Sequence, residues 1–179
     1  MKNKTLVIMA HTNPNDSVVN NKIKHALQDE QNVLYKDIKS LYRDFNFDVK
    51  KEQEDLLSVD KIIFQFPLYW FTAPSVLKQW VDDVFTHDFA FRYDENGQWQ
   101  TLKLQDKEFQ MIVTIGASEE EYNQMGVKVK DCLSSYSTTA MSLGMKEIEP
   151  YLLYGIDSVK YTNEQLDDIM GDIKEKISA

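Results

Sequence analysis

The feature of this sequence that most constrains its fold is a set of five short apolar segments spread along the chain. Polar turn residues flank these segments, and several of the stretches between them have the spacing of amphipathic helices. Short buried strands that alternate with helices are typical of a parallel sheet covered on both faces. The segments are residues 5–10, 32–38, 61–66, 109–115 and 148–154. We therefore predict an α/β fold: a doubly wound, five-stranded parallel sheet of order 2-1-3-4-5, with helices on both faces.

Helices are predicted between these strands and after the last one. Ser17 or Asp16 is expected to cap the first helix, and Pro74 opens another. Thr162 and Gln165 have the spacing of a capping box for the closing helix. The predicted helices cover residues 17–28, 74–87, 127–143 and 163–177, with a further charged helix within residues 39–60.

The chain is predicted to form one domain, residues 1–179, because no linker, repeat or low-complexity segment divides it. Residues 88–108 interrupt the alternation of strands and helices. Aromatic residues flank an Asn96-Gly97 turn signal within this stretch, which predicts a hairpin-like excursion from the sheet.

Composition and motifs exclude several classes of protein. Twenty basic and 29 acidic side chains give a net charge of −9, which disfavours binding to nucleic acid or to an anionic membrane. Cys132 is the only cysteine, so no internal disulfide forms, and no apolar run reaches the roughly 18 residues that span a bilayer. We expect a cytoplasmic protein. The three histidines lack metal-ligand spacing, so no metal site is predicted, and no Walker or GxSxG motif occurs.

The loops after the first, third and fourth strands are expected to form a binding site. They cover residues 11–20, 67–74 and 114–122. In the predicted strand order these three strands are neighbours, and ligands of such sheets bind beyond the carboxyl ends of the strands. The three loops should therefore converge on one crevice.

The first loop offers groups that suit a phosphate. His11, Ser17 and Asn20 supply an imidazole, a hydroxyl and an amide beside the N–H groups of a helix N-terminus. A purely structural interpretation is also open. In that case His11 caps the strand, Ser17 caps the helix, and Asn20 is a surface residue of the first turn.

The second loop is aromatic. Pro67 ends the third strand and four large side chains follow in succession at residues 68–71, which is unusual in a surface loop. Such a cluster suits a flat, apolar ligand, although core packing or a dimer surface are alternatives. In the third loop, Gly116 is either a ligand contact or a plain turn, and residues 119–121 are expected to be a solvated acidic patch.

Three stretches together resemble the flavodoxin-like NAD(P)H:quinone oxidoreductase family. The most specific is FQFPLYWFTAPSVLKQWVDDVF at residues 64–85; the others are the segment from His11 to Asn20 and VTIGASEEEY at residues 113–122. This family includes the DT-diaphorase type of quinone reductase, bacterial general stress oxidoreductases and ancillary subunits of potassium-efflux systems.

The resemblance implies a flavin site built from all three loops. The first loop would surround the phosphate and ribityl chain, the second would run along the isoalloxazine, and the third would contact its polar edge. The implied flavin-binding residues are His11, Ser17, Val18, Val19, Asn20, Pro67, Leu68, Tyr69, Trp70, Phe71, Thr114, Ile115, Gly116, Ala117 and Tyr122.

Two of the implied roles are catalytic. Tyr122 falls on the family's tyrosine that assists hydride transfer, and Lys128 stands where the mammalian enzymes have a histidine. A lysine there would stabilise negative charge on the reduced flavin. Ile115 and Ala117 depart from the family's Thr-Thr-Gly-Gly pattern, and the Ala117 methyl group stands where a backbone approaches closely.

The implied activity is a two-electron transfer from NAD(P)H through the flavin to a quinone or another small planar acceptor. FMN is expected, with FAD as the alternative, and the family resemblance also implies a homodimer. Two other functions are open: an ancillary regulatory subunit of a glutathione-gated potassium efflux system, with a membrane transporter as partner, and an electron-carrier flavodoxin.

Overall fold

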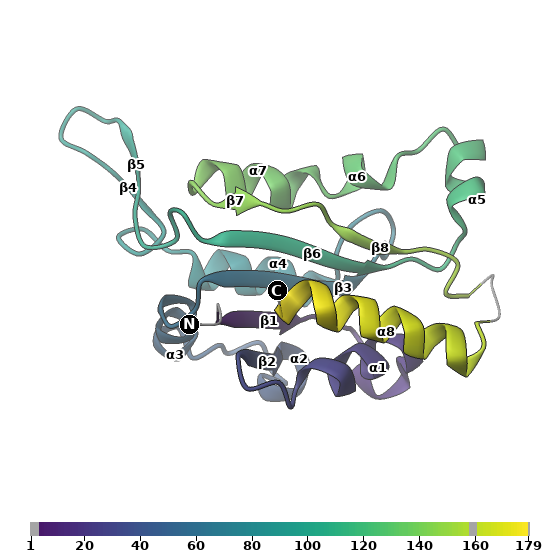
Figure 1. The fold of residues 1–179 in the computed structure, drawn as a ribbon. Helices are drawn as coiled ribbons and strands as arrows, with labels where there is room; N and C mark the ends of the chain where they lie inside the picture. Colours follow the sequence, from purple (N-terminus) through teal and green to yellow (C-terminus); the bar gives the residue numbers. More distant parts are fainter. Residues whose placement is uncertain (1–3, 158–160, 179) are drawn as a thin grey trace.

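The computed structural model describes residues 4–157 and 161–178. Its main sheet has the order β2-β1-β3-β6, and the short strands β7 and β8 both pair with β6 at its outer side (Figure 1). All of these pairs are parallel. The strands are β1 (Thr5–Met9), β2 (Val33–Asp37), β3 (Lys61–Pro67), β6 (Glu108–Thr114), β7 (Lys146–Glu147) and β8 (Tyr151–Leu153). Because β7 and β8 together occupy the place of the fifth strand, the predicted order is confirmed.

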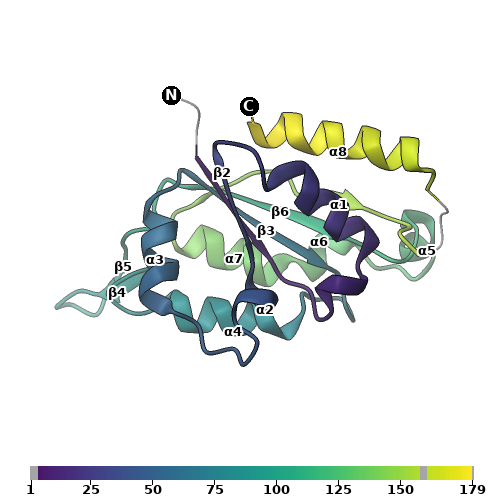
Figure 2. The ribbon, with the colours of Figure 1, turned by 90° about the horizontal axis from the view of Figure 1, so that it is seen from below.

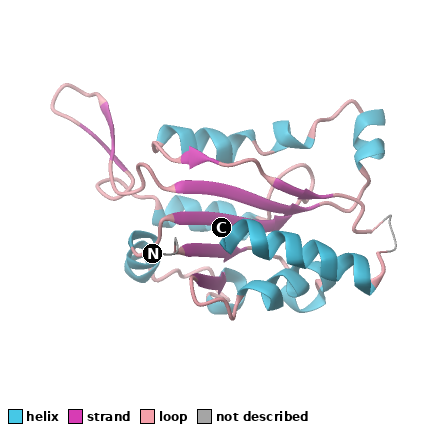
Figure 3. Cartoon of the chain, in the orientation of Figure 1, coloured by secondary structure: helices cyan, strands magenta, loops and turns pink. Residues whose placement is uncertain are grey.

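Helices cover both faces of this sheet, as Figure 2 and Figure 3 show. Helices α1 and α8 lie on one face, and α3, α4 and α7 lie on the other. The helices are α1 (Val18–Leu27), α2 (Ile38–Leu41), α3 (Val49–Leu57), α4 (Ser75–Val84), α5 (Glu119–Gln124), α6 (Val129–Cys132), α7 (Ser134–Ser142) and α8 (Asn163–Ser178). Within the described part of the chain, no helix is both long and apolar enough to cross a membrane.

The two-sided burial follows from the alternation of side chains along each strand. Val7, Ile63 and Ile112 are fully or almost fully buried and form one apolar cluster with residues of α1 and α8. Their neighbours along the strands face the opposite cluster, where the ring of Phe64 meets that of Trp80 edge to face at 5.9 Å. Each strand therefore contributes to two cores at once.

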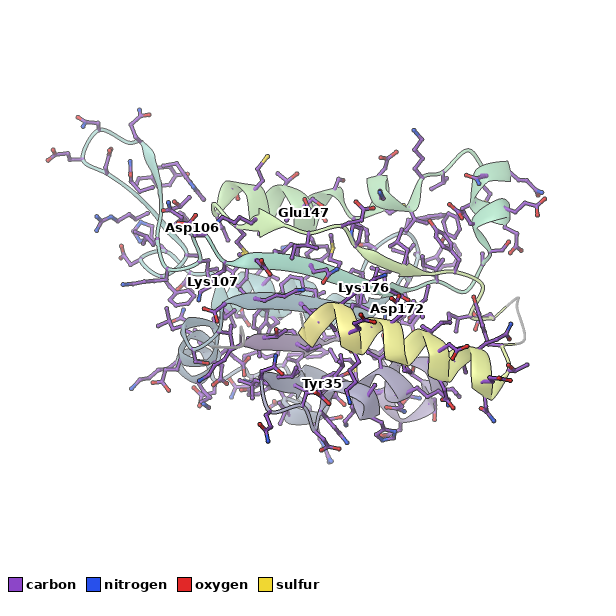
Figure 4. The ribbon with its side chains drawn as sticks, in the orientation of Figure 1. Tyr35, Asp106, Lys107, Glu147, Asp172 and Lys176 are labelled. Atoms are coloured by element: carbon purple, nitrogen blue, oxygen red, sulfur yellow. The ribbon has the colours of Figure 1, made fainter. Side chains whose placement is uncertain are left out.

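Helix capping follows the sequence signals. The Ser17 side chain accepts the Asn20 N–H at 3.4 Å and caps α1. Before α8, the Thr162 N–H donates to Gln165 Oε1 at 2.8 Å, and the Gln165 N–H donates to Thr162 Oγ1 at 3.2 Å. The predicted capping box is therefore confirmed. Asp172 joins helix α8 to the sheet, because it accepts a hydrogen bond from Tyr151 on β8. Asp172 also accepts one from Lys176, one turn further along the same helix (Figure 4).

Two predicted elements are interrupted. The helix expected over residues 127–143 forms as α6 and α7 with a break at Leu133, in a stretch rich in serine and threonine. The fifth strand is broken between β7 and β8, where Pro150 has no N–H to donate to a ladder.

The predicted excursion is a two-stranded hairpin of β4 (Phe91–Tyr93) and β5 (Trp99–Thr101). Gly97 adopts a φ of +74° at its turn, and the Phe91 and Trp99 rings stack with centroids 4.3 Å apart. In Figures 1 and 2 this hairpin projects from the end of the sheet opposite α5, at the amino ends of the strands.

A buried group of charges joins β2 to the helices on one face. Lys36 on β2 forms ion pairs with Glu52 and Asp55 on α3, and Glu52 is fully buried. Glu52 also accepts hydrogen bonds from Tyr42 at 2.6 Å and from the Trp80 indole at 3.1 Å. Asp55 also pairs with the exposed Lys51, so the loss of the Lys36 ammonium leaves the fully buried Glu52 without a positive partner.

The Lys36→Met substitution is expected to lower the free energy of unfolding by about 3–5 kcal/mol, because it leaves the buried Glu52 carboxylate without a counter-charge. Urea denaturation measures the change. The matched control is Lys51→Met, which also removes an ion pair to Asp55 but from an exposed lysine side chain. This control should change stability little. Equal effects of the two substitutions would contradict the assignment.

Candidate functional site

A cavity of about 880 Å³ opens at the carboxyl end of the sheet. This volume lies in the range of roughly 300–1,000 Å³ that is typical of small-molecule sites. The loops after β1, β3 and β6 all contribute to its lining, so the three loops converge on one crevice. All the residues implied as flavin-binding line the cavity except Trp70 and Phe71, and Lys128 also lies outside its lining.

A fourth segment, which the sequence reasoning missed, completes the cavity. After β8, Ile156 and Asp157 line it, as do Tyr161 and Leu166 next to and within α8. Ligands bind beyond the carboxyl ends of parallel strands, and this rule applies to the fifth strand too. It could therefore have predicted from the sequence that the segment after this strand lines the cavity. In the first loop, Asn13 and Asp16 also line the cavity.

Asn20 holds the first loop against the sheet. It is only 2% exposed, and its Nδ2 donates to Ser17 Oγ and to Thr114 Oγ1, both at 3.0 Å. Its Oδ1 accepts from Gln65 Nε2 at 3.0 Å, and Gln65 Oε1 in turn accepts from the Tyr35 hydroxyl at 2.7 Å (Tyr35 is labelled in Figure 4). The Asn20 amide is thus engaged by protein partners, and its action is to position Ser17 and Thr114.

The N-terminus of α1 faces the cavity. Val18 and Val19 lie in the first turn of this ten-residue helix, where backbone N–H groups have no intrahelical acceptor. These N–H groups and the positive end of the helix dipole favour an anion such as a phosphate. The geometry therefore agrees with the role expected of the first loop.

His11 is bonded through both ring nitrogens. Nδ1 accepts the Asn13 N–H at 3.0 Å, so we assign the ring proton to Nε2, which lies 3.1 Å from the Tyr69 hydroxyl. Burial lowers the pKa of His11, against the opposing effects of the Asp37 and Asp16 charges. The ring is consequently neutral at pH 7 and donates to the Tyr69 oxygen.

Gly116 permits a close contact between the third and fourth segments. A Cβ atom at this position would lie 2.4 Å from Asp157 Oδ2. The two segments run together, since the Gly155 N–H donates to the Ala117 carbonyl at 2.8 Å and the Ile156 N–H donates to the Ile115 carbonyl at 2.9 Å. The glycine therefore lets the Asp157 carboxylate pack directly against the backbone beside the cavity.

Trp70 and Phe71 form a strained turn at the edge of the site. Their φ angles are +46° and +63°, and the flanking Tyr69 and Thr72 exchange backbone hydrogen bonds of 2.8 and 3.0 Å. Two-residue turns with positive φ at both positions normally use asparagine and glycine. Trp70 is 92% exposed. Such strain clusters at ligand sites, so this turn is a candidate contact for a planar ligand above the cavity.

The aromatic turn reaches the third loop at Tyr122. The rings of Phe71 and Tyr122 meet edge to face at 6.2 Å. Burial, followed by the charge of Cys132, raises the pKa of Tyr122, so its hydroxyl stays protonated at neutral pH. The hydroxyl has no hydrogen-bond partner in the described part of the chain. Lys128 is exposed as the N-cap of α6, and its expected catalytic role stays a prediction.

Comparison with known proteins places the chain in a family. Residues 3–177 match the family described as having a flavodoxin-like fold, and the chain belongs to it. The protein is 36% identical over 175 residues to YrkL, named as an uncharacterised NAD(P)H oxidoreductase of Bacillus subtilis, with 93% of this chain and 97% of the relative covered. The family resemblance inferred from the sequence motifs is thus confirmed.

Two further relatives carry informative names. The glutathione-regulated potassium-efflux system ancillary protein KefG of Erwinia tasmaniensis is 30% identical over 154 residues, covering 84% of this chain and 80% of that protein. The crystal structure of general stress protein 14 from Treponema denticola in complex with FMN superposes with a TM-score of 0.81 at 25% identity, covering 97% of this chain and 95% of that one.

The Trp70→Asn substitution is expected to stabilise the fold by about 0.5–1 kcal/mol, because asparagine tolerates a positive φ and the exposed indole contributes little packing. Thermal denaturation should show a melting temperature about 1–4 °C higher. Trp70→Ala is the matched control, since alanine has no preference for this conformation and should bring a smaller gain or none. A Trp70→Asn protein that melts below the wild type would contradict the assignment of backbone strain to this turn.

The buried neutral His11 should make the fold sensitive to mild acid. The unfolded chain binds a proton at this ring below about pH 6.5, whereas the folded ring does so only at lower pH. The stabilisation is therefore complete above about pH 6.5 and is lost as the pH falls toward the folded pKa. Urea unfolding between about pH 7 and pH 5 should show a shallower decline for His11→Gln than for the wild type. Identical pH profiles would contradict this account.

Proposed function

We propose that this protein is a flavin-dependent NAD(P)H oxidoreductase that passes two electrons to a quinone or a similar planar acceptor. The observation that carries the proposal is the cavity itself, where a helix N-terminus suited to a phosphate and an aromatic turn suited to a planar ring lie at one crevice. The relatives named NAD(P)H oxidoreductase and the relative solved with FMN support it.

The residues of the cavity would hold a flavin by its two ends. The N-terminal N–H groups of α1 and the Ser17 hydroxyl would bind the phosphate, and the backbone of the loops after β3 and β6 would bind the ring. When bound, the flavin supplies the hydride chemistry. FMN is favoured over FAD because a relative of this fold was solved with FMN.

The aromatic residues would serve the substrates. Trp70 and Phe71 offer flat surfaces at the edge of the cavity, where a nicotinamide and then a planar acceptor would stack in turn. The Tyr122 hydroxyl is protonated and without a partner in the described chain, so it is able to donate a hydrogen bond where negative charge develops.

A second candidate function is that of an ancillary subunit of a potassium-efflux system. The identity of 30% to KefG favours it. This role is compatible with enzymatic activity, because a flavin-binding protein can also bind a transporter. Co-purification with a membrane transporter would support this function. The homodimer implied by the family resemblance also belongs to the proposed enzyme function. Sedimentation at micromolar concentration tests it.

The test of the enzyme function is a steady-state assay of the flavin-loaded protein with menadione and with NADH or NADPH. We expect turnover with at least one nicotinamide, and heat release followed by chromatography should identify FMN. Tyr122→Phe should lower kcat roughly 10-fold to 100-fold because a donor to the developing charge is lost. Its flavin content should stay unchanged. A loaded protein with no turnover for either nicotinamide would defeat the proposal.

A further inference from the structure

The hydrogen bonds of His11 fix where the hydrogen of the Tyr69 hydroxyl points. Nδ1 accepts the Asn13 N–H, so the ring proton is on Nε2 and is donated to the Tyr69 oxygen at 3.1 Å. A hydroxyl that accepts from His11 must direct its own hydrogen elsewhere. Among the described residues no acceptor receives it, and Tyr69 lines the cavity. The Tyr69 hydroxyl is therefore a free donor facing a ligand.

The position of this donor is next to the anion-binding end of the cavity. His11 and Asn13 belong to the loop that leads to Ser17 and the N-terminus of α1. The hydroxyl of Tyr69 lies within hydrogen-bond distance of that loop, although Tyr69 itself follows β3. Tyr122, by contrast, contacts the aromatic turn on the side of the third loop. Tyr69 therefore contacts the first loop through its hydroxyl, whereas Tyr122 contacts the second loop through its ring.

The cavity has acidic but no basic side chains in its described lining, so an anion there depends on neutral hydrogen-bond donors. Among the described residues that line the cavity there is no lysine or arginine, whereas Asp16 and Asp157 both line it. The Asp16 carboxylate accepts a hydrogen bond from the Asn13 side chain. Burial raises the pKa of Tyr69, and the charge of Asp157 raises it further, so the hydroxyl keeps its proton. An anionic phosphate here must be held by N–H and O–H groups.

We propose that Tyr69 binds the phosphate of the flavin through its hydroxyl and that His11 is a positioning residue that aims this hydroxyl. The inference rests on the proposed flavin function and changes the role expected for His11. The family resemblance places the His11 ring beside the phosphate, but both of its nitrogens already have protein partners. His11 acts on the phosphate through Tyr69.

The experiment compares FMN with riboflavin, which has the same ring and ribityl chain but no phosphate. The dissociation constants of both compounds are measured by fluorescence titration of wild-type, Tyr69→Phe and His11→Phe apoprotein. Tyr69→Phe should weaken FMN binding roughly 10-fold to 100-fold, as expected for a lost hydrogen bond to a charged group, and leave riboflavin binding within about 2-fold. Equal losses for both compounds, or no loss for FMN, would overturn the proposal.

Tyr161→Phe is the matched control. Tyr161 lines the same cavity, but its hydroxyl already donates to the Tyr154 carbonyl at 2.7 Å. Its removal should leave the ratio of the riboflavin and FMN dissociation constants unchanged. A change in this ratio as large as that of Tyr69→Phe would count against the proposal.

The positioning role of His11 is tested by a double-mutant cycle. His11→Phe should lower the preference for FMN over riboflavin when it is made in the wild type. It should not do so in the Tyr69→Phe background, because both changes remove the same hydrogen bond from the Tyr69 hydroxyl to the phosphate. His11→Gln, whose amide N–H replaces Nε2–H, should restore much of the preference. Additive effects would show that His11 acts independently of Tyr69. Wild-type protein that binds neither flavin would overturn the proposed function and this inference with it.

Discussion

The amide of Asn20 is the point on which the candidate site depends. One side chain bonds to Ser17 on its own loop, to Thr114 at the end of β6 and to Gln65 on β3. Because the amide is almost completely shielded from water, each of these bonds would leave an unsatisfied polar group if it were broken. The network thus fixes the N-terminus of α1 relative to the ends of two neighbouring strands, and it places this helix end at the cavity.

Rigid and strained parts of the site are arranged around that network. The first loop is fixed by hydrogen bonds and the fourth segment by the contact of Asp157 with Gly116, whereas the aromatic turn holds two residues in an unfavourable backbone conformation. Stable packing beneath the cavity tolerates this local strain. Natural binding sites commonly combine a rigid scaffold with a strained segment that contacts the ligand.

The sequence predicted the strands, the caps of α1 and α8 and the hairpin from local or periodic patterns. It predicted the strand order and the three converging loops from the common topology of doubly wound sheets. It did not predict the break at Leu133, nor the split of the fifth strand, which coincides with Pro150 and its missing N–H. The place of Asp157 at the cavity follows from the same topological rule applied to the fifth strand, whereas its contact with Gly116 depends on tertiary packing. The bonding of both His11 nitrogens also depends on atoms that only the fold brings together.

The hairpin of β4 and β5 and the cavity lie at opposite ends of the same sheet. The hairpin leaves the body of the protein at the amino ends of the strands, while the cavity opens at their carboxyl ends. The tip of this hairpin lies away from the loops that line the cavity. Extra residues inserted there would lengthen the ribbon without disturbing the crevice, which makes this tip a natural attachment point for a fluorophore or an affinity tag.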